Sequence, residues 1–301
     1  MVTRLARVRR LLHANYNCVD VESLERWYTE LFGLRAAMRS ESGDADGTPF
    51  GLVMATAWRA VFLYDHRGAR RTSALELVKW LRPPTIGRPH PNPWEHGIQA
   101  AGFRVPDLDA VVRKVAALGG TVVHRAPDVV LLRDPEGLPV EVLLAPGEPA
   151  EHRHLRVVVH DLATSAAWWR RLGFEPAPEA IRVGADRIWT GDGEHAVDGE
   201  VALVAADDRS FAIHLTTWSG PPPRGPSYGA PFHQGLYRVA MAVDDVQAAW
   251  TALRDAGLAI QPPYTFPLPG TKITQGLTIL FLRDPDGILV ELVERPASHF
   301  R

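Results

Sequence analysis

Residues 131–144 read LLRDPEGLPVEVLL, and residues 281–294, 150 positions further on, read FLRDPDGILVELVE. In each copy a turn with Pro followed by Gly separates two apolar runs, a pattern that predicts two strands joined by a tight turn. The second run places a carboxylate, Glu141 or Glu291, among apolar residues. A carboxylate on an apolar strand face costs several kcal/mol unless water, an arginine or a metal ion compensates it, so both glutamates are candidate functional residues.

The rest of the chain also repeats. The matching stretches are 11–34 with 152–174, 74–84 with 212–222, and 92–120 with 230–258. Between the two copies lies the segment APGEPAE, whose Pro and Gly residues suit a linker. The sequence therefore predicts two homologous domains, residues 1–146 and 151–301.

Each half divides again into two units with the same order of elements. In residues 102–120 a short strand ends at an Asp-containing turn, an amphipathic helix with Asp109 as its expected N-cap follows, and Gly ends the helix. Residues 15–34 follow the same order, and two or three strand-like runs come after each helix. Because this unit occurs four times, the pattern predicts an α+β fold made of four repeated modules.

Composition limits the class of partner. The chain has 301 residues, a formal net charge of −2 and no long basic or acidic run, which argues against nucleic acid or an anionic membrane surface as its main partner. The single cysteine, Cys18, excludes a disulfide framework and a cysteine-based zinc site. No stretch approaches the ~20 apolar residues of a membrane span, so we expect a cytoplasmic protein without a membrane segment.

Four stretches carry a resemblance to a known superfamily: HANYNCVDVESLERWYTELFGL (13–34), LRDPEGLPVEVLL (132–144), HLRVVVHDLATSAAWWRRLGF (154–174) and LRDPDGILVELVE (282–294). They resemble the vicinal oxygen chelate superfamily, which includes glyoxalase I, bleomycin-resistance proteins, extradiol dioxygenases and several epimerases. The resemblance covers almost the whole chain. It implies βαβββ modules paired into two glyoxalase-like domains, each with a curved mixed sheet around a cleft. It also implies a divalent metal ion in the cleft, held by residues of the first and last strand of each module.

The ligand positions of this superfamily carry over one residue at a time. In chain order, the first- and last-strand positions of the modules hold His13 and Glu76, Ala100 and Glu141, His154 and His214, and Arg238 and Glu291. Ala100 and Arg238 stand where histidine is usual, so each half lacks one ligand. The six remaining residues form a donor set of histidines and glutamates that suits Zn, Mn, Fe, Co or Ni.

The pairing of the modules decides how these ligands group. Pairing within each half predicts the sets His13/Glu76/Glu141 and His154/His214/Glu291. Pairing of the first module with the fourth, and of the second with the third, predicts His13/Glu76/Glu291 and Glu141/His154/His214. We expect pairing within halves, because the linker is short and consecutive elements usually lie side by side. On this expectation the second half has the better-balanced ligand set for chemistry.

Strand alternation and the ligand positions indicate further cleft residues. His13 shares one strand face with Asn15 and Asn17, whereas Leu12 falls on the opposite, apolar face. The candidate substrate-binding residues are Arg238, Tyr237, Trp80, Trp218 and Gln99. Arg238 occupies a ligand position, so its side chain is expected to face the cleft and to bind an anionic substrate group. The adjacent Tyr237 then faces away from the cleft.

These residues favour a metal-dependent enzyme that acts on a small oxygenated molecule. We expect a redox-neutral isomerase, epimerase or lyase, in which the metal acidifies a C–H bond next to a carbonyl and Glu141 or Glu291 moves the proton. One alternative is an Fe(II) extradiol-type ring-cleaving dioxygenase, which the set His154/His214/Glu291 favours. The other is a metal-free drug-binding protein of the bleomycin-resistance type, with which nine tryptophans are compatible. Homodimerisation stays open, because no residue argues for it.

Overall fold

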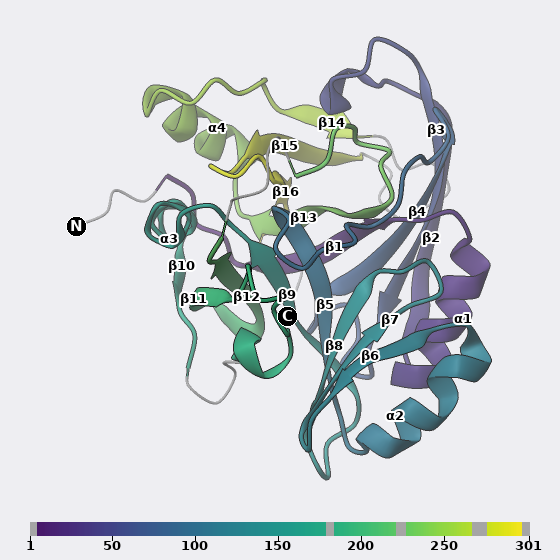
Figure 1. Ribbon diagram of the computed structural model, residues 1–301. Coiled ribbons are helices and arrows are strands. Elements are labelled where there is room, and N and C mark those ends of the chain that lie inside the picture. The colour runs from purple at the N-terminus through teal and green to yellow at the C-terminus, as the bar shows by residue number, and fades with distance from the viewer. Residues whose placement is uncertain (1–4, 179–183, 221–226, 267–275, 297–301) are drawn as a thin grey trace.

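The computed structural model describes residues 5–178, 184–220, 227–266 and 276–296. Each of four modules begins with a strand and a helix and continues with strands, so the predicted α+β fold of βαβββ modules is confirmed (Figure 1). The first module contains β1 (Arg10–Asn17), α1 (Val21–Phe32), β2 (Arg35–Ala45), η1 (Thr48–Phe50), β3 (Thr56–Tyr64) and β4 (Ala74–Arg82). The second contains β5 (Gly97–Val105), α2 (Leu108–Val115), η2 (Ala116–Leu118), β6 (Thr121–Arg125), β7 (Val129–Arg133) and β8 (Pro139–Leu144).

The second half repeats this order. The third module contains β9 (Glu151–Val158), α3 (Leu162–Arg171), β10 (Phe174–Pro176), η4 (Ala185–Arg187), β11 (Val197–Ala205) and β12 (Asp208–Trp218). The fourth contains β13 (Gly235–Val243), α4 (Val246–Asp255), β14 (Tyr264–Phe266), β15 (Leu277–Arg283) and β16 (Leu289–Glu294).

An aspartate begins each of the four α-helices that the structure describes. These N-caps are Asp20, Asp107, Asp161 and Asp245, and each side chain accepts a hydrogen bond from the backbone N–H three residues further on. The expectation that Asp109 caps α2 is wrong. Asp107 has the extended backbone of a cap, with φ −148° and ψ 107°, and Asp109 lies inside the first helical turn.

The first strands of the modules pair across the two halves of the chain. β1 runs antiparallel to β13, with Asn15 opposite Arg238, and β5 runs antiparallel to β9, with Ala100 opposite Arg156. The first module therefore pairs with the fourth and the second with the third, and the expectation of pairing within halves is wrong. The short linker is the physical reason. β5 and β8 run parallel and end together, and the chain then turns back at once to lay β9 along the other edge of β5.

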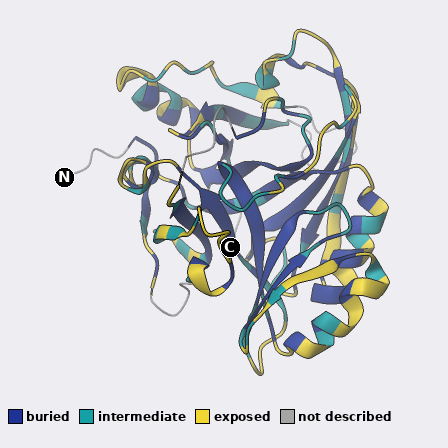
Figure 2. Ribbon diagram, in the orientation of Figure 1, coloured by how far each residue is buried: buried dark blue, intermediate teal, exposed yellow. Residues whose placement is uncertain are grey.

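All the strands that the structure describes belong to one open, mixed sheet with two parts. The part that we call the first sheet joins the first and fourth modules in the order β2-β3-β4-β1-β13-β16-β15-β14. The part that we call the second sheet joins the second and third modules in the order β10-β11-β12-β9-β5-β8-β7-β6. The two parts meet where Leu236 of β13 pairs with Ile98 of β5. Strands β1, β5 and β13 are buried along most of their length at the centre of the molecule (Figure 2).

The turns of the repeated hairpins tie the two modules of each half together. The hydroxyls of Tyr16 and Tyr28 donate to Asp134 of the DPEG turn at 3.2 and 3.1 Å. Glu136 of the same turn accepts hydrogen bonds from the backbone at the start of α1. In the second half Asp286 of the DPDG turn accepts from the backbone N–H just before α3. The turns therefore hold each half together while the sheets join the halves.

A β-bulge in β1 corrects one expectation about the strand faces. The register between β1 and β13 shifts between Leu11 and His13. An extra residue in one strand interrupts the alternation of side chains. As a result Leu11 packs in the main core, and Leu12, which was expected on that face, lies beside His13 along a cavity.

Candidate active site

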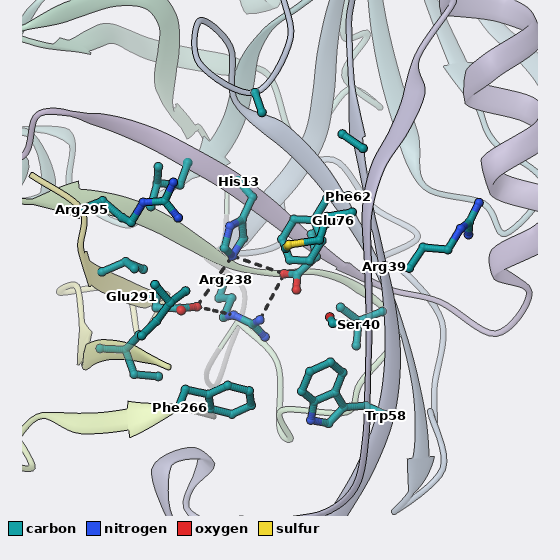
Figure 3. Close-up of a pocket in the computed structure, with 18 of the residues that line it drawn as sticks. His13, Arg39, Ser40, Trp58, Phe62, Glu76, Arg238, Phe266, Glu291 and Arg295 are labelled. Carbon is teal, nitrogen blue, oxygen red and sulfur yellow. Dashed lines mark hydrogen bonds and ion pairs between the residues drawn. The ribbon is translucent and has the colours of Figure 1, made fainter. Parts of the chain in front are cut away.

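A cavity of about 580 Å³ lies in the first sheet, between the strands of the first module and those of the fourth. Strands β1 to β4 form one side and strands β13 to β16 the other, so neither half of the chain builds the cavity alone (Figure 3). Its walls are mostly apolar and include the aromatic side chains of Phe50, Trp58, Phe62, Trp80, Phe266 and Phe281. This volume and lining are typical of a site for a small organic molecule.

Four polar side chains meet on the floor of this cavity (Figure 3). Nε2 of His13 on β1 lies 3.3 Å from Oε2 of Glu76 on β4 and 3.8 Å from Oε2 of Glu291 on β16. Arg238 on β13 lies between the carboxylates, with Nη2 3.1 Å from Oε2 of Glu76 and Nε 2.8 Å from Oε2 of Glu291. Pairing of the first module with the fourth thus brings together His13, Glu76 and Glu291, and it adds Arg238.

Burial and charge act in opposite directions on this floor. Burial alone would raise the pKa of Glu291, but the charge of Arg238 and the contact with His13 outweigh it and lower the pKa to about 2. Burial alone would lower the pKa of Arg238, and the charges of Glu76 and Glu291 raise it above its usual value. Arg238 and Glu291 are therefore both charged at any pH near neutrality.

The superfamily resemblance implies a divalent cation at this position, and the donor atoms of the cavity floor show whether one fits. Nε2 of His13 is buried, faces two carboxylates and makes no hydrogen bond of normal geometry within the described residues. Both carboxylates, however, already bind Arg238 through their Oε2 atoms. Across the described ranges, no group of three or more His, Cys, Asp or Glu side chains is placed so that it could hold a metal ion. The residues present do not fit a divalent cation.

The other predicted ligands form a second cluster on the second sheet. Nε2 of His154 lies 2.8 Å from Oε2 of Glu141, and the rings of His154 and His214 are 4.7 Å apart. Arg156 binds both oxygens of Glu141 and also donates to Glu200 at 2.7 Å. This grouping again follows the pairing of the second module with the third.

This second cluster is closed to solvent. The side chains of Glu141, His154, Arg156 and His214 are at most 2% exposed. Trp189 lies over them and donates from Nε1 to Oε1 of Glu141 at 2.6 Å. Burial would raise the pKa of Glu141, but Arg156 and His154 hold it well below its usual range. The cluster has the properties of a buried structural network of ion pairs. Because both clusters combine residues of the two halves, the better-balanced ligand set that was expected in the second half does not form.

Two predicted ligand sets do not form. Glu141 lies in the buried cluster and not with His13 and Glu76, and Glu291 lies on the cavity floor and not with His154 and His214. The second of these sets was the basis of the Fe(II) dioxygenase alternative. The reason is the pairing of first strands across the halves, which exchanges the two glutamates between the sites.

Only some of the predicted substrate-binding residues line the cavity. Arg238 and Trp80 line the cavity, and Nε1 of Trp80 donates to Oδ1 of Asn17 at 3.0 Å. Tyr237 points to the opposite face and packs with Tyr228 and Leu289. Gln99 and Trp218 also lie outside the cavity: Gln99 donates to the carbonyl of Glu95, and Trp218 packs edge-on against Trp94.

Sequence reasoning did not identify several residues of both sites. Phe50, Trp58 and Phe281 line the open cavity, and Trp189 closes the second cluster. Phe281 had a detectable signal, because it opens the second hairpin copy where the first copy has Leu131. The others lie in stretches without a repeated motif, so their positions depend on the tertiary structure.

Comparison with known proteins places these observations in context. A family model described as the Glyoxalase/Bleomycin resistance protein/Dioxygenase superfamily matches residues 10–142 and again residues 152–292. The uncharacterized protein YwkD of Bacillus subtilis is 27% identical over 143 residues, which are 47% of this chain and 94% of that protein.

Solved structures show the same fold. Glyoxalase I from Zea mays superposes with a TM-score of 0.67 at 20% identity, covering 95% of this chain and 92% of its own. A mutant of that enzyme gives a TM-score of 0.66 at 20% identity, covering 94% of this chain and 93% of its own. Among the residues described, no helix is both long and apolar enough to cross a membrane.

Proposed function

Because the chain belongs to the Glyoxalase/Bleomycin resistance protein/Dioxygenase superfamily, we propose that the cavity of the first sheet is an active site for a small oxygenated molecule. The observation that carries this proposal is the convergence of His13, Glu76, Arg238 and Glu291 on the floor of a mostly apolar cavity. Charged groups held in a largely water-excluded site interact more strongly with a substrate than they would in water.

The proposed reaction is a redox-neutral proton transfer, as in an isomerase, an epimerase or a lyase. Glu291 takes the proton from a C–H bond next to a carbonyl, and the electron pair of that bond moves toward the carbonyl oxygen. The proton then returns to the neighbouring carbon or to the other face of the same carbon, or it leaves with a departing group. No oxidant or reductant is consumed. Its pKa of about 2 keeps Glu291 ionised, and the contact with Arg238 makes it a weak base until a substrate oxygen takes over part of that guanidinium.

The walls restrict which substrates fit. Aromatic rings such as Trp58, Phe266 and Phe281 surround the space above the charged floor. A substrate with an apolar or ring-shaped part and one oxygenated end matches these aromatic walls and this charged floor. Its apolar part leaves water to contact the walls, and its oxygens reach the floor.

Solvent deuterium exchange tests this proposal. A panel of hydroxyketones and hydroxyaldehydes is incubated with the protein in D₂O. NMR then follows the incorporation of deuterium at the carbon next to the carbonyl. Glu291→Gln should lower the exchange rate by about 10²–10⁴-fold, the usual contribution of a general base. Tyr237→Phe is the control, because Tyr237 faces away from the cavity and its removal should leave the rate within about 2-fold. Equal rates for the wild type and Glu291→Gln would contradict the proposal.

The aromatic walls also favour a second candidate, a protein that sequesters an aromatic drug. Trp58 and Phe266 lie with ring centroids 5.7 Å apart and tilted by 30°, and a planar ligand could stack against either of them. Quenching of tryptophan fluorescence by a planar drug, with no exchange or turnover in any substrate of the panel, would favour this candidate over the enzyme.

A further inference from the structure

We infer that Arg238 takes the place of a divalent cation in this cavity and that the site works without one. Its guanidinium binds Oε2 of Glu76 through Nη2 at 3.1 Å and Oε2 of Glu291 through Nε at 2.8 Å. A metal ion held by the same two Oε2 atoms would have to displace the guanidinium. One cation therefore already bridges the two carboxylates.

Charge balance supports this assignment. The guanidinium of Arg238 already places one positive charge between the two carboxylates. These four side chains are only 6–12% exposed. A dication bound to the same carboxylates would lie next to the guanidinium, and little water is present to weaken the repulsion between the two cations.

Arg238 is held firmly in place. Its Cζ lies 5.8 Å from the ring centroid of Phe50, and its strand position on β13 is opposite Asn15 of β1. Asn15 in turn donates from Nδ2 to Oε2 of Glu76 at 3.3 Å, which fixes the carboxylate that Arg238 binds. Arginine stays protonated in proteins, so this charge cannot be removed by a change of pH in the working range.

This inference rests on the proposed function and narrows its substrate class. Nη1 of Arg238 has no hydrogen-bond partner within the described part of the chain, and the residue lines the cavity. An N–H group there donates to a carbonyl oxygen and balances the negative charge that develops when the neighbouring C–H bond loses its proton. A single carbonyl oxygen is enough, so the substrate does not need two adjacent oxygens to chelate a metal.

Metal binding by the wild-type protein is the first test. Protein purified without chelators is analysed for metal content and titrated calorimetrically with Zn²⁺, Mn²⁺, Co²⁺ and Ni²⁺. We expect no stoichiometric metal and no saturable site that depends on His13. One equivalent of bound metal in the wild type, lost in His13→Ala and in Glu76→Gln, would overturn the inference.

Arg238→His is the second test. It removes the guanidinium and adds an imidazole to His13, Glu76 and Glu291, a set of nitrogen and oxygen donors suited to Zn²⁺ or Ni²⁺. We expect the variant to gain one metal site at least 100-fold tighter than any site in the wild type, and His13→Ala in this background should remove it. Arg283→His is the matched control, because Arg283 lies on β15, which β16 separates from β13, and contacts Tyr237 instead of the carboxylates.

The outcomes separate this inference from the proposed function. A wild-type enzyme that exchanges substrate protons equally fast with and without EDTA, and whose Arg238→His variant binds metal, supports both. A wild-type enzyme that needs its bound metal for exchange would overturn the inference and leave the proposed function standing. A folded Arg238→His variant that binds no metal would also overturn the inference. If that variant does not fold, the metal content of the wild type decides alone.

Discussion

Nη2 of Arg238 lies 3.1 Å from Oε2 of Glu76, although the two residues are 162 positions apart in the chain. The contact joins β13 of the last module to β4 of the first, and β1 lies between these two strands in the sheet. It can form only when both halves of the chain have folded together. The charge on the cavity floor is thus a property of the joined halves.

The charge of Arg238 should control the ionisation of Glu291. Replacing Arg238 with methionine keeps a long side chain and removes the charge. Burial would then raise the pKa of Glu291 with only His13 to oppose it, so we expect a rise of about one unit or more from its value of about 2. Titration of labelled glutamate carboxyls by NMR measures this shift. Arg283→Met is the control, and an unchanged pKa in Arg238→Met would contradict the prediction.

The buried cluster of the second sheet should be a large contributor to stability. Arg156 is 1% exposed and binds Glu141 and Glu200. Arg156→Met leaves Glu141 buried without its guanidinium partner, which should lower the free energy of unfolding by about 3–5 kcal/mol. Urea denaturation measures the loss. Arg209→Met, at an exposed pair, should change stability by less than about 1 kcal/mol. Equal effects of the two substitutions would show that the cluster has no structural role.

The stability of the fold should fall in mild acid. Burial lowers the pKa of His154 to about 4, from 6.5 when exposed, despite the nearby Glu141. The unfolded chain therefore binds a proton at this residue before the folded protein does. The resulting stability is fully present above pH 6.5 and is lost as the pH falls toward 4, by at most about 1.4 kcal/mol per pH unit. Denaturation midpoints of the wild type and His154→Gln between pH 4.5 and 7 test this, and equal slopes would contradict it.

Two phenylalanines should set the length of ligand that the cavity accepts. Phe50 and Phe281, with ring centroids 5.3 Å apart, line both the 580 Å³ cavity and a neighbouring cavity of about 630 Å³. Phe281→Ala removes one of the two rings that separate the cavities. Ligands with a longer apolar chain could then extend into the second cavity, so they should gain affinity relative to short ones. Calorimetric titration with a series of alkyl ketones tests the change. An unchanged order of affinities in Phe281→Ala would show that the two cavities stay separate.

The predicted domains, residues 1–146 and 151–301, should not fold independently. Each half alone would leave the edges of two first strands without their partners, since β1 pairs with β13 and β5 with β9. Exposed strand edges promote association, so a half expressed alone should aggregate or form a dimer. Co-expression of both halves should give a 1:1 complex on size-exclusion chromatography. A soluble, folded monomer of either half would contradict this prediction.

Local features of the fold were predictable because they depend on neighbouring residues. Aspartate before each amphipathic helix and the Pro–Gly turn of each hairpin act over a few positions, and the structure contains the helices and turns they indicate. The placement of Asp109 failed by two residues, since a second aspartate in the same turn, Asp107, has the extended backbone that a cap requires.

The candidate residues were predictable, but their grouping was not. Strand parity placed Glu76, Arg238 and Glu291 on the side where the cavity lies, and it placed Tyr237 on the other. The role of Arg156 was not identified, although it shares a strand face with His154. A guanidinium interacts with whichever carboxylates lie within its reach, and this depends on strands that are distant in sequence.

The sequence by itself determined the four modules, most of the strand faces and the residue types that line them, because side-chain alternation and helix capping are local. Only the tertiary structure decided that Glu291 joins His13 while Glu141 joins His154. It also decided that the first of these groups opens into a cavity and that Trp189 covers the second. The physical reason is that strand pairing is chosen by the whole chain. The turn after β8 brings β9 to the other edge of β5, and the pairing of β1 with β13 completes the exchange between the halves.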